Sequence, residues 1–450
     1  MKKRTASGNQ ITEGIIWKQL LLFFFPIVLG TFFQQLYNTA DAIVVGRFVG
    51  KEALAAVGGS TGQIINLVVG FFVGLSSGAT VVIAQFFGAK DEQNLSKSLH
   101  SAIAFSIVGG IVMSILGILL SPAILRLMNT PENVMADSTL YLRVYFGGIL
   151  FVFLYNIGSG ILRAVGDSKR PLYFLIICCF LNIFLDLLLV VVFHMGVAGV
   201  ALGTLISQAV SAVLIIVTLC RSKEMYHLTL REIRFYRAPL LSLLRIGIPA
   251  GFQSVMYNLA NVTIQSALNA FGTDAMAAWT AFGKIDSLFW MISGAFGTSV
   301  TTFVGQNYGA GKYDRIRKSV KVSLGMFFGT AIAISLIMIT LGQYMFYLFT
   351  TDDTVIEIGM QILRLIVPAY ATFVFIEIYS GALRAMGDVF IPMLMTCGGV
   401  CILRILWILV VVPINSSIQT IMFSYPISWI LTSILFFIYF HRKQGKLPAR

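Results

Sequence analysis

Charged residues are scarce in this chain of 450 residues, since Asp, Glu, Lys and Arg together make up 11% of it. A soluble domain carries roughly 25% charged residues, so this scarcity excludes an ordinary soluble protein. Apolar runs such as "LYFLIICCFLNIFLDLLLVVVF" exceed the roughly 20 residues that cross a 30 Å hydrocarbon layer. The runs are continuous and do not alternate with polar residues, which excludes a membrane β-barrel. The chain is predicted to be an all-α polytopic membrane protein.

Cysteine and histidine are also few, with five of the first and four of the second. The cysteines lie in or at the ends of apolar segments and lack metal-ligand spacing, which argues against a disulfide framework or a zinc site. The histidines are scattered, and no His–Asp or Ser–Lys set converges. We therefore expect no enzyme and no cofactor, and a membrane-embedded enzyme is kept only as a remote alternative.

The chain carries a net charge of +13, which by itself could suggest a nucleic-acid partner. Most Lys and Arg, however, fall in tails and loops on one side of the predicted spans. This is the positive-inside pattern, which places both termini in the cytoplasm. The first apolar stretch lacks a small-residue cleavage site, so we interpret it as a retained span. We expect a multi-pass protein of the bacterial inner membrane that binds no nucleic acid.

Twelve apolar segments are predicted to span the bilayer, in two sets of six. They lie near 17–46, 53–86, 99–120, 138–163, 171–193 and 196–220, and near 240–270, 276–306, 320–349, 358–384, 390–413 and 417–440. The longest polar stretch lies between the sets. The predicted organisation is an N-lobe (1–220, helices 1–6), a cytoplasmic linker (221–239) and a C-lobe (240–450, helices 7–12).

The two halves repeat each other. "GILRAVGDSKRP" starts at residue 160 and "GALRAMGDVFIP" at residue 381, an offset of almost half the chain. At nearly the same offset, "FVGKEALAAVG" at 48–58 matches "AFGTDAMAAWT" at 270–280, and "AQFFGAKD" at 84–91 matches "GQNYGAGK" at 305–312. Because six spans are an even number, both halves enter the membrane from the same side. They are therefore predicted to be parallel repeats, an arrangement known from transporters.

The repeated motif predicts a hairpin on the cytoplasmic side of each half. Arg163 and Arg384 end the fourth span of their half, and Gly166 and Gly387 can terminate those helices in a left-handed conformation. The proline that closes each copy suits the first turn of the next helix. A role in structure and topology is the simpler interpretation, and an ion pair used in gating is the alternative.

Two carboxylates fall inside predicted spans, where each costs about 2.5–3.5 kcal/mol at the centre of a transmembrane helix. Asp41 follows Pro26 on span one at the same separation at which Asp186 follows Pro171 on span five. Both spans run outward, so at 1.5 Å per residue both carboxylates lie about 22 Å from the cytoplasmic end. We expect them to share one layer in the outer half of the membrane.

Further polar residues lie at a similar depth. Asn182 is one turn from Asp186, and Thr204 and Tyr141 approach the same layer from spans six and four; the stripe below Asp41 contains Gln34, Tyr37 and Asn38. Carboxylate, amide and hydroxyl oxygens suit a hard cation, and two adjacent carboxylates can also hold a proton. The predicted coupling site for Na⁺ or H⁺ consists of Asp41, Asn182, Asp186 and Thr204. Hydrogen bonding between helices is the alternative interpretation.

The second half differs from the first. Its span seven carries the polar stripe Gln253, Tyr257, Asn261 and Gln265 but no carboxylate. Its intramembrane charges are Lys284, Asp286, Glu377 and Arg404, which sum to zero. Internal ion pairing is one interpretation, and contact of Asp286 or Glu377 with a substrate is the other. Ion chemistry is therefore predicted mainly in the first half.

The span-one sequence "QQLYNTADAIVVGRFVG", the segment "AQFFGAKD" and the paired "LRAxGD" hairpins resemble the multidrug and toxic compound extrusion (MATE) transporters. The resemblance extends from about Leu20 to Phe440. It implies two six-helix lobes around a central cleft. It also implies export of organic compounds, often cationic and aromatic, in exchange for Na⁺ or H⁺ by alternating access. We expect such a transporter to act as a monomer with small-molecule substrates.

The resemblance also implies site residues. The branch of the family with a first-lobe ion site uses an Asp on span one, an Asn and an Asp one turn apart on span five, and a Thr on span six. These correspond to Asp41, Asn182, Asp186 and Thr204. The NorM-like branch has a glutamate on span seven where this chain has Tyr257. The chain therefore resembles the DinF-like or MepA-like branch more closely.

The alternative within transport is a flippase. A flippase of related architecture for lipid-linked oligosaccharides would favour a cationic cleft for a pyrophosphate head group. The most prominent intramembrane pair here is anionic, Asp41 with Asp186. We therefore favour the antiporter, in which an ion bound at these two residues and an organic substrate favour different conformations.

Overall fold

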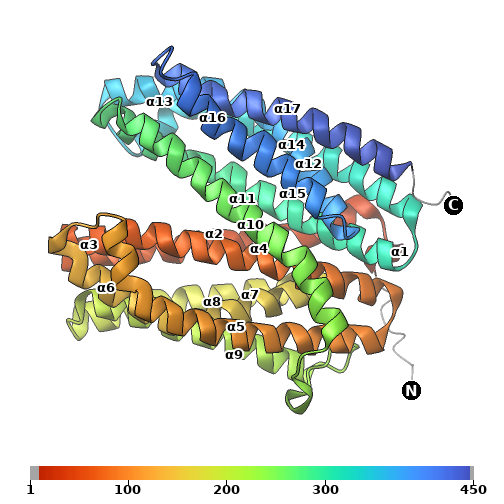
Figure 1. The fold of residues 1–450 in the computed structure, drawn as a ribbon. Coiled ribbons are helices and arrows are strands. Elements are labelled where there is room, and N and C mark those ends of the chain that lie inside the picture. Colours follow the sequence, from red (N-terminus) through yellow and green to blue (C-terminus); the bar gives the residue numbers. More distant parts are fainter. Residues whose placement is uncertain (1–9, 446–450) are drawn as a thin grey trace. The chain divides into compact units, whose positions relative to one another are not determined.

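The computed structural model describes residues 10–445, which form helices joined by short connections and contain no strand. Eleven helices in this range are long and apolar enough to cross a membrane. A further pair, α6 (Glu132–Gly147) and α7 (Ile149–Ala164), is bent by 46° and counts as a twelfth span. The prediction of an all-α protein with twelve spans is confirmed. Figure 1 labels the helices along the chain.

The helices pack into two units. Residues 25–251 form one, called here the N-unit, and the described residues 10–24 and 252–445 form the other, the C-unit. The boundaries fall inside α2 (Ile16–Val44) and α10 (Arg237–Asn269), so the first turns of each helix belong to a different unit from the rest. The sequence predicts a different division, into an N-lobe (1–220), a linker (221–239) and a C-lobe (240–450). That division stays a prediction.

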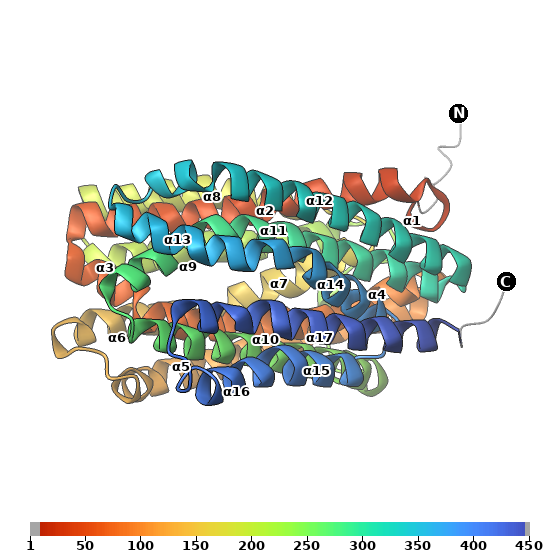
Figure 2. The same ribbon diagram turned by 90° about the horizontal axis from the view of Figure 1, so that it is seen from above.

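Within the N-unit the long helices run side by side (Figures 1 and 2). Besides parts of α2 and α10 it contains α3 (Lys51–Gly58), α4 (Ser60–Ala89), α5 (Glu92–Leu127), α6, α7, α8 (Lys169–Asp186) and α9 (Gly196–Arg221). Short π-helical segments at Val45–Val49 and Leu187–Val192 continue α2 and α8. The polar stretch that follows α9 is held by hydrogen bonds. The Thr229 amide donates to His100 Nε2 at 3.1 Å, and the Tyr236 amide donates to Ser101 Oγ at 2.9 Å.

The C-unit repeats this pattern of long helices. It contains α1 (Gln10–Glu13), α11 (Thr273–Gly309), α12 (Tyr313–Tyr347), α13 (Asp353–Ile366), α14 (Tyr370–Ala385), α15 (Phe390–Thr396), α16 (Leu403–Val410) and α17 (Ile418–Gln444). A π-helical segment, Cys397–Ile402, joins α15 to α16. Two side chains at the start of α12 hold the chain near α1, since Lys312 Nζ donates to the Thr12 carbonyl and Arg315 Nε to the Ile11 carbonyl, both at 3.0 Å.

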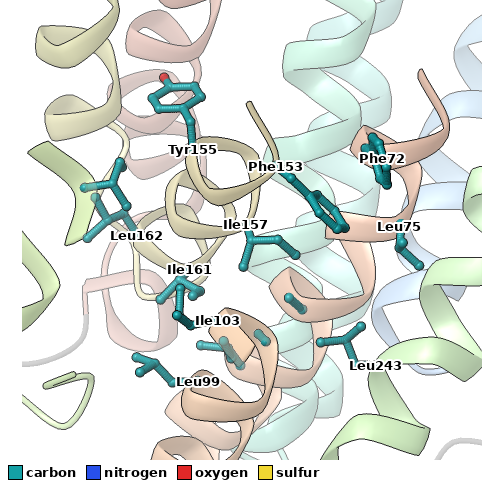
Figure 3. Close-up of a cluster of buried hydrophobic side chains, with 14 of the residues drawn as sticks. Phe72, Leu75, Leu99, Ile103, Phe153, Tyr155, Ile157, Ile161, Leu162 and Leu243 are labelled. Carbon is teal, nitrogen blue, oxygen red and sulfur yellow. The ribbon is translucent and has the colours of Figure 1, made fainter. Parts of the chain in front are cut away.

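Aromatic side chains fill much of the N-unit core. Phe72 of α4 and Phe153 of α7 lie with ring centroids 4.1 Å apart, and Phe153 is completely buried. Figure 3 shows them among leucine and isoleucine side chains of the same cluster. Because lipid tails are as apolar as these side chains, the association of membrane helices depends on close packing more than on removal from water.

Helices α4 and α10 approach each other through glycines at four-residue spacing. Gly74 and Gly78 on α4 face Gly247 and Gly251 on α10. A Cβ added at Gly74 would lie 2.6 Å from the Ala250 carbonyl oxygen, and one added at Gly78 would lie still closer to the Leu243 carbonyl oxygen. This is the small-xxx-small arrangement that lets the backbones of membrane helices touch. It holds the first turns of α10, up to Gly251, against α4 within the N-unit.

The repeated motif forms the predicted hairpin in both units. Gly166 has φ 94° and Gly387 has φ 84°, so both adopt the predicted left-handed conformation. The aspartates of the motif have different ion-pair partners. Asp167 Oδ2 pairs with Arg170 Nε at 3.2 Å, and Asp388 Oδ2 with Lys443 Nζ at 3.1 Å. Neither copy shows an ion pair within 4.0 Å between its own arginine and aspartate.

We predict that Gly78→Ala destabilises the protein by about 1–3 kcal/mol, the usual cost of overpacking, because the obstructing atoms are backbone atoms that cannot rotate away. Thermal unfolding in detergent measures the effect. Gly325→Ala on α12 is the control, since a Cβ there meets nothing within 4 Å. Equal unfolding temperatures for the two variants would show that the glycine contact does not matter.

Candidate functional site

The structure brings the predicted coupling residues together within the N-unit. Asp41 of α2 and Asp186 of α8 are 6% and 0% exposed, and Asn182 is 1% exposed. Asp41 lies within interaction distance of Asp186 and Asn182. Thr204 of α9 donates a hydrogen bond from Oγ1 to Asp41 Oδ2 at 3.3 Å. The four predicted residues therefore form one buried cluster, called here the carboxylate cluster.

Several oxygens of the carboxylate cluster have no hydrogen-bond partner. They are Asp41 Oδ1, both carboxylate oxygens of Asp186 and the amide oxygen of Asn182. None of the ion pairs within 4.0 Å among residues 10–445 includes either aspartate. A buried charge without a partner is strongly disfavoured. Two such carboxylates in contact are not both ionised unless a positive charge compensates them.

Local backbone structure places the two carboxylates. Each stands close to a π-helical segment, since Val45–Val49 begins four residues after Asp41 and Leu187–Val192 begins directly after Asp186. Such segments often occur at functional sites because they redirect the side chains of a helix. Gly203 on α9 lets Asp186 approach, since a Cβ there would lie 2.5 Å from Asp186 Oδ1.

A small cavity adjoins the carboxylate cluster. Its volume is about 10 Å³ for the centre of a water-sized sphere, room for about one water molecule or small ion. Its lining includes Tyr37, Cys178, Asn182, Thr204, Ser207, Gln208 and Ser211. Sequence reasoning missed Gln208, which donates from Nε2 to the Tyr37 hydroxyl at 3.3 Å. Its position one turn after Thr204 on α9 was the available signal.

The other predicted residues of the N-unit are arranged unevenly. Tyr141 of α6 is 5% exposed and lies near both Asp41 and Asp186. Tyr37 is buried and lies near Gln34 as well as Gln208. Gln34 and Asn38 are exposed. Tyr141 and Tyr37 thus belong to the surroundings of the cluster, whereas Gln34 and Asn38 do not line its cavity.

The donor set of the cluster matches a hard cation or a proton. Carboxylate, amide and hydroxyl oxygens are the ligands that hard cations such as Na⁺ prefer. Within the described residues, no group of three or more His, Cys, Asp or Glu side chains is arranged to hold a metal ion. The cluster has two carboxylates, which fits a singly charged ion better than a transition metal.

The charges of the C-unit form a different arrangement. Asp286 accepts hydrogen bonds from Trp290 Nε1 at 2.6 Å and from the Tyr370 hydroxyl. Arg404 is 2% exposed, and its guanidinium lies 3.9 Å from the centre of the Tyr425 ring. Asp286 and Arg404 interact at longer range, since no ion pair within 4.0 Å among residues 10–445 includes either one.

The remaining C-unit residues gather around a second arginine. Glu377 of α14 interacts with Arg384 two turns further along the same helix, and Tyr257 of α10 lies near Glu377. Asn261 and Lys284 are exposed. Glu377 and Arg384 interact at longer range, since no ion pair within 4.0 Å among residues 10–445 includes either one, and Lys284 lies outside both groups.

We predict that Arg404→Lys lowers the free energy of unfolding by about 1–3 kcal/mol. Lysine lacks the planar guanidinium that stacks on Tyr425, and it loses the hydrogen bond from Nε to Ser428 Oγ at 3.0 Å. Thermal unfolding in detergent tests this, with Arg442→Lys at an exposed position of α17 as the control. Unchanged stability in Arg404→Lys would show that the stacking and the hydrogen bond contribute nothing.

Comparison with known proteins supports a transporter. The MatE family model matches residues 26–188 and 249–410. The chain is 30% identical over 384 residues to the probable multidrug resistance protein YoeA of Bacillus subtilis, covering 84% of this chain and 83% of that protein. It is 25% identical over 408 residues to the multidrug export protein MepA of Staphylococcus aureus, covering 89% and 86%.

Solved structures share the fold. A MOP superfamily transporter from Pyrococcus furiosus superposes with a TM-score of 0.92 at 23% identity, covering 100% of both chains. An outward-facing multidrug resistance MATE family transporter gives a TM-score of 0.90 at 22% identity over 99% of both chains. The predicted resemblance and the two-lobe helical fold are thereby confirmed. The chain belongs to the MatE family and is a membrane transporter, not an enzyme.

Proposed function

We propose that this protein exports organic compounds, chiefly cationic and aromatic ones, from the cytoplasm in exchange for Na⁺ or H⁺. The observation that carries the proposal is the carboxylate cluster, in which Asp41 and Asp186 meet with three of their four oxygens unpartnered. Such a pair binds an inorganic cation or a proton because no positively charged side chain among the described residues pairs with its negative charges. The names of YoeA and MepA, which state multidrug resistance and multidrug export, support the choice of substrate.

Two coupling ions fit the cluster. For Na⁺, the oxygens of Asp41, Asp186, Asn182 and Thr204 supply a set of carboxylate, amide and hydroxyl ligands. For H⁺, one carboxyl group keeps a proton and donates it toward the other, which removes the repulsion between two negative charges. The adjoining cavity has room for about one small ion or water molecule.

Export requires that ion and substrate favour different conformations. A ligand shifts an equilibrium only by its differential affinity for the two states. We propose that an ion bound at Asp41 and Asp186 favours the conformation that has released the organic substrate. By linkage, the substrate then weakens ion binding by the same factor by which the ion weakens substrate binding.

The side chains proposed to contact the substrate or to support the site are Gln34, Tyr37, Asn38, Tyr141, Tyr257, Asn261, Asp286 and Glu377. Carboxylates among them suit a cationic compound, and aromatic faces attract cations as well. We also propose that the protein acts as a monomer in the bacterial inner membrane, with both termini in the cytoplasm, since Lys and Arg gather in loops of one side.

We predict that Asp41→Asn reduces gradient-driven export at least tenfold, because the amide removes one of the two charges that bind the ion. Dye transport by inverted vesicles measures the rate, with a sodium gradient and a proton gradient imposed separately. Asp137→Asn, an exposed acidic residue on α6, is the matched control and should transport at the wild-type rate. Normal gradient-driven export by Asp41→Asn would rule out the proposed ion site.

A second prediction concerns the position of Asp186. A Cβ added at Gly203 would press on Asp186 Oδ1, so Gly203→Ala should weaken ion binding about tenfold while leaving both carboxylates in place. The shift of the unfolding temperature with added Na⁺ or with pH measures ion binding to the purified protein. Gly283→Ala, where a Cβ meets nothing within 4 Å, is the control. An ion-dependent shift of wild-type size in Gly203→Ala would contradict the assignment of Asp186.

A further inference from the structure

A second cavity of the N-unit is lined by the positively charged side chain of Arg163, which has no acidic partner within 4.0 Å in the described part of the chain. Its volume is about 70 Å³ for the centre of a water-sized sphere, and α2, α7 and α8 line it. Its polar lining residues include Thr31, Gln34, Tyr155, Asn156, Ser159 and Arg163, and the lining contains no Asp or Glu. This cavity, called here the Arg163 pocket, is separate from the cavity beside the carboxylate cluster.

The Arg163 guanidinium keeps unused hydrogen-bonding capacity. Its Nη2 donates to Ser159 Oγ at 3.2 Å, whereas its buried Nε has no partner. None of the ion pairs within 4.0 Å among residues 10–445 includes Arg163. A guanidinium with a buried, unpartnered N–H group and no carboxylate beside it gains from an anion that accepts from that group. The aspartate of the same motif, Asp167, pairs with Arg170 instead.

The neighbouring polar side chains of Tyr155 and Asn156 already donate hydrogen bonds to the backbone, so an anion in the pocket would bind to Arg163. Tyr155 donates its hydroxyl to the Pro171 carbonyl at 3.3 Å, and Asn156 donates from Nδ2 to the Val152 carbonyl at 2.8 Å. Figure 3 shows the Tyr155 hydroxyl pointing away from the apolar core cluster. Tyr155 and Asn156 are thus held in place by their own hydrogen bonds to the backbone. The charge of Arg163 is left without an anionic partner in the pocket.

The C-unit places an acid near the same arginine of the motif, although no ion pair within 4.0 Å among residues 10–445 includes Arg384. Arg384, the counterpart of Arg163 in the repeat, donates from Nη2 to Ser380 Oγ at 3.4 Å, as Arg163 does to Ser159. Arg384 also interacts with Glu377, whose counterpart in the first half is Asn156. The two units therefore hold the same arginine and serine, but only the C-unit supplies the carboxylate. In the N-unit the uncharged Asn156 stands at that position, so an anionic ligand can interact with Arg163 instead.

We propose that the Arg163 pocket binds a phosphate group, either that of an anionic phospholipid head group or that of a free phosphate. A guanidinium binds phosphate oxygens with paired, charge-assisted hydrogen bonds. The volume is several times the 10–15 Å³ or so that one water molecule needs, which suits a small oxyanion. Arg163 ends the fourth span on the side predicted to be cytoplasmic, and basic pockets between membrane helices on that side bind lipid head groups.

The test uses Asn156→Asp, which copies the C-unit arrangement into the N-unit. The new carboxylate lies beside Arg163 and competes with the phosphate, so binding should weaken at least tenfold while Arg163 stays in place. Asn156→Ser, which adds no charge, is the matched control and should bind within about threefold of wild type. Arg163→Gln should also weaken binding at least tenfold. Because Asn156→Asp adds an ion-pair partner, its loss of binding does not depend on a destabilised fold.

Two titrations of the purified full-length protein separate the sources of the phosphate. In one, potassium phosphate is compared with potassium chloride at equal ionic strength in a neutral detergent. In the other, micelles with phosphatidylglycerol are compared with micelles with phosphatidylcholine. The unfolding temperature reports binding in both.

Either titration can support the proposal. A shift in the phosphate titration that Asn156→Asp abolishes assigns a free phosphate, and such a shift only with phosphatidylglycerol assigns a lipid head group. The absence of a shift in both titrations, or equal shifts in wild type and Asn156→Asp, would overturn the proposal.

Discussion

The contact between two buried carboxylates is the constraint on which the rest of the molecule depends. Asp41 and Asp186 are buried, and three of their four carboxylate oxygens have no hydrogen-bond partner. Water would solvate such charges, but lipid and packed helices cannot. We propose that a bound proton or cation compensates the pair, and that its occupancy is coupled to the conformation that can reach each side of the membrane.

The repeated halves share a scaffold and differ in charge. The hairpins with Gly166 and Gly387 have the same left-handed turn. At the position that corresponds to Asp186 in the repeat, however, the C-unit has Trp407, which donates from Nε1 to the Thr420 carbonyl at 2.8 Å. Conversely, the C-unit has Glu377 where the N-unit has Asn156. Exchange of single residues within a common framework thus gives the N-unit an uncompensated acidic pair and, at Arg163, an uncompensated base.

Much of this organisation could be predicted from the sequence. The scarcity of charge and the apolar runs predict twelve spans, and the equal spacing from a proline predicts a common depth for Asp41 and Asp186. Contacts between helices could not be predicted from residue spacing along a span. The spacing gives the depth of a residue in the membrane but not the neighbouring helix that its side chain faces. Gln208 was missed for this reason, and the longer-range arrangement of Asp286 with Arg404 depends on the aromatic rings around them.

The central claim is that ion and organic substrate oppose each other's binding through the Asp41 and Asp186 pair. The most direct measurement titrates purified protein with an organic cation while following bound radioactive sodium and released protons in the same sample. The account predicts that substrate expels one of the two ions from the wild-type protein, and that Asp186→Asn shows no such exchange. Ion occupancy that stays constant as the substrate binds would contradict it.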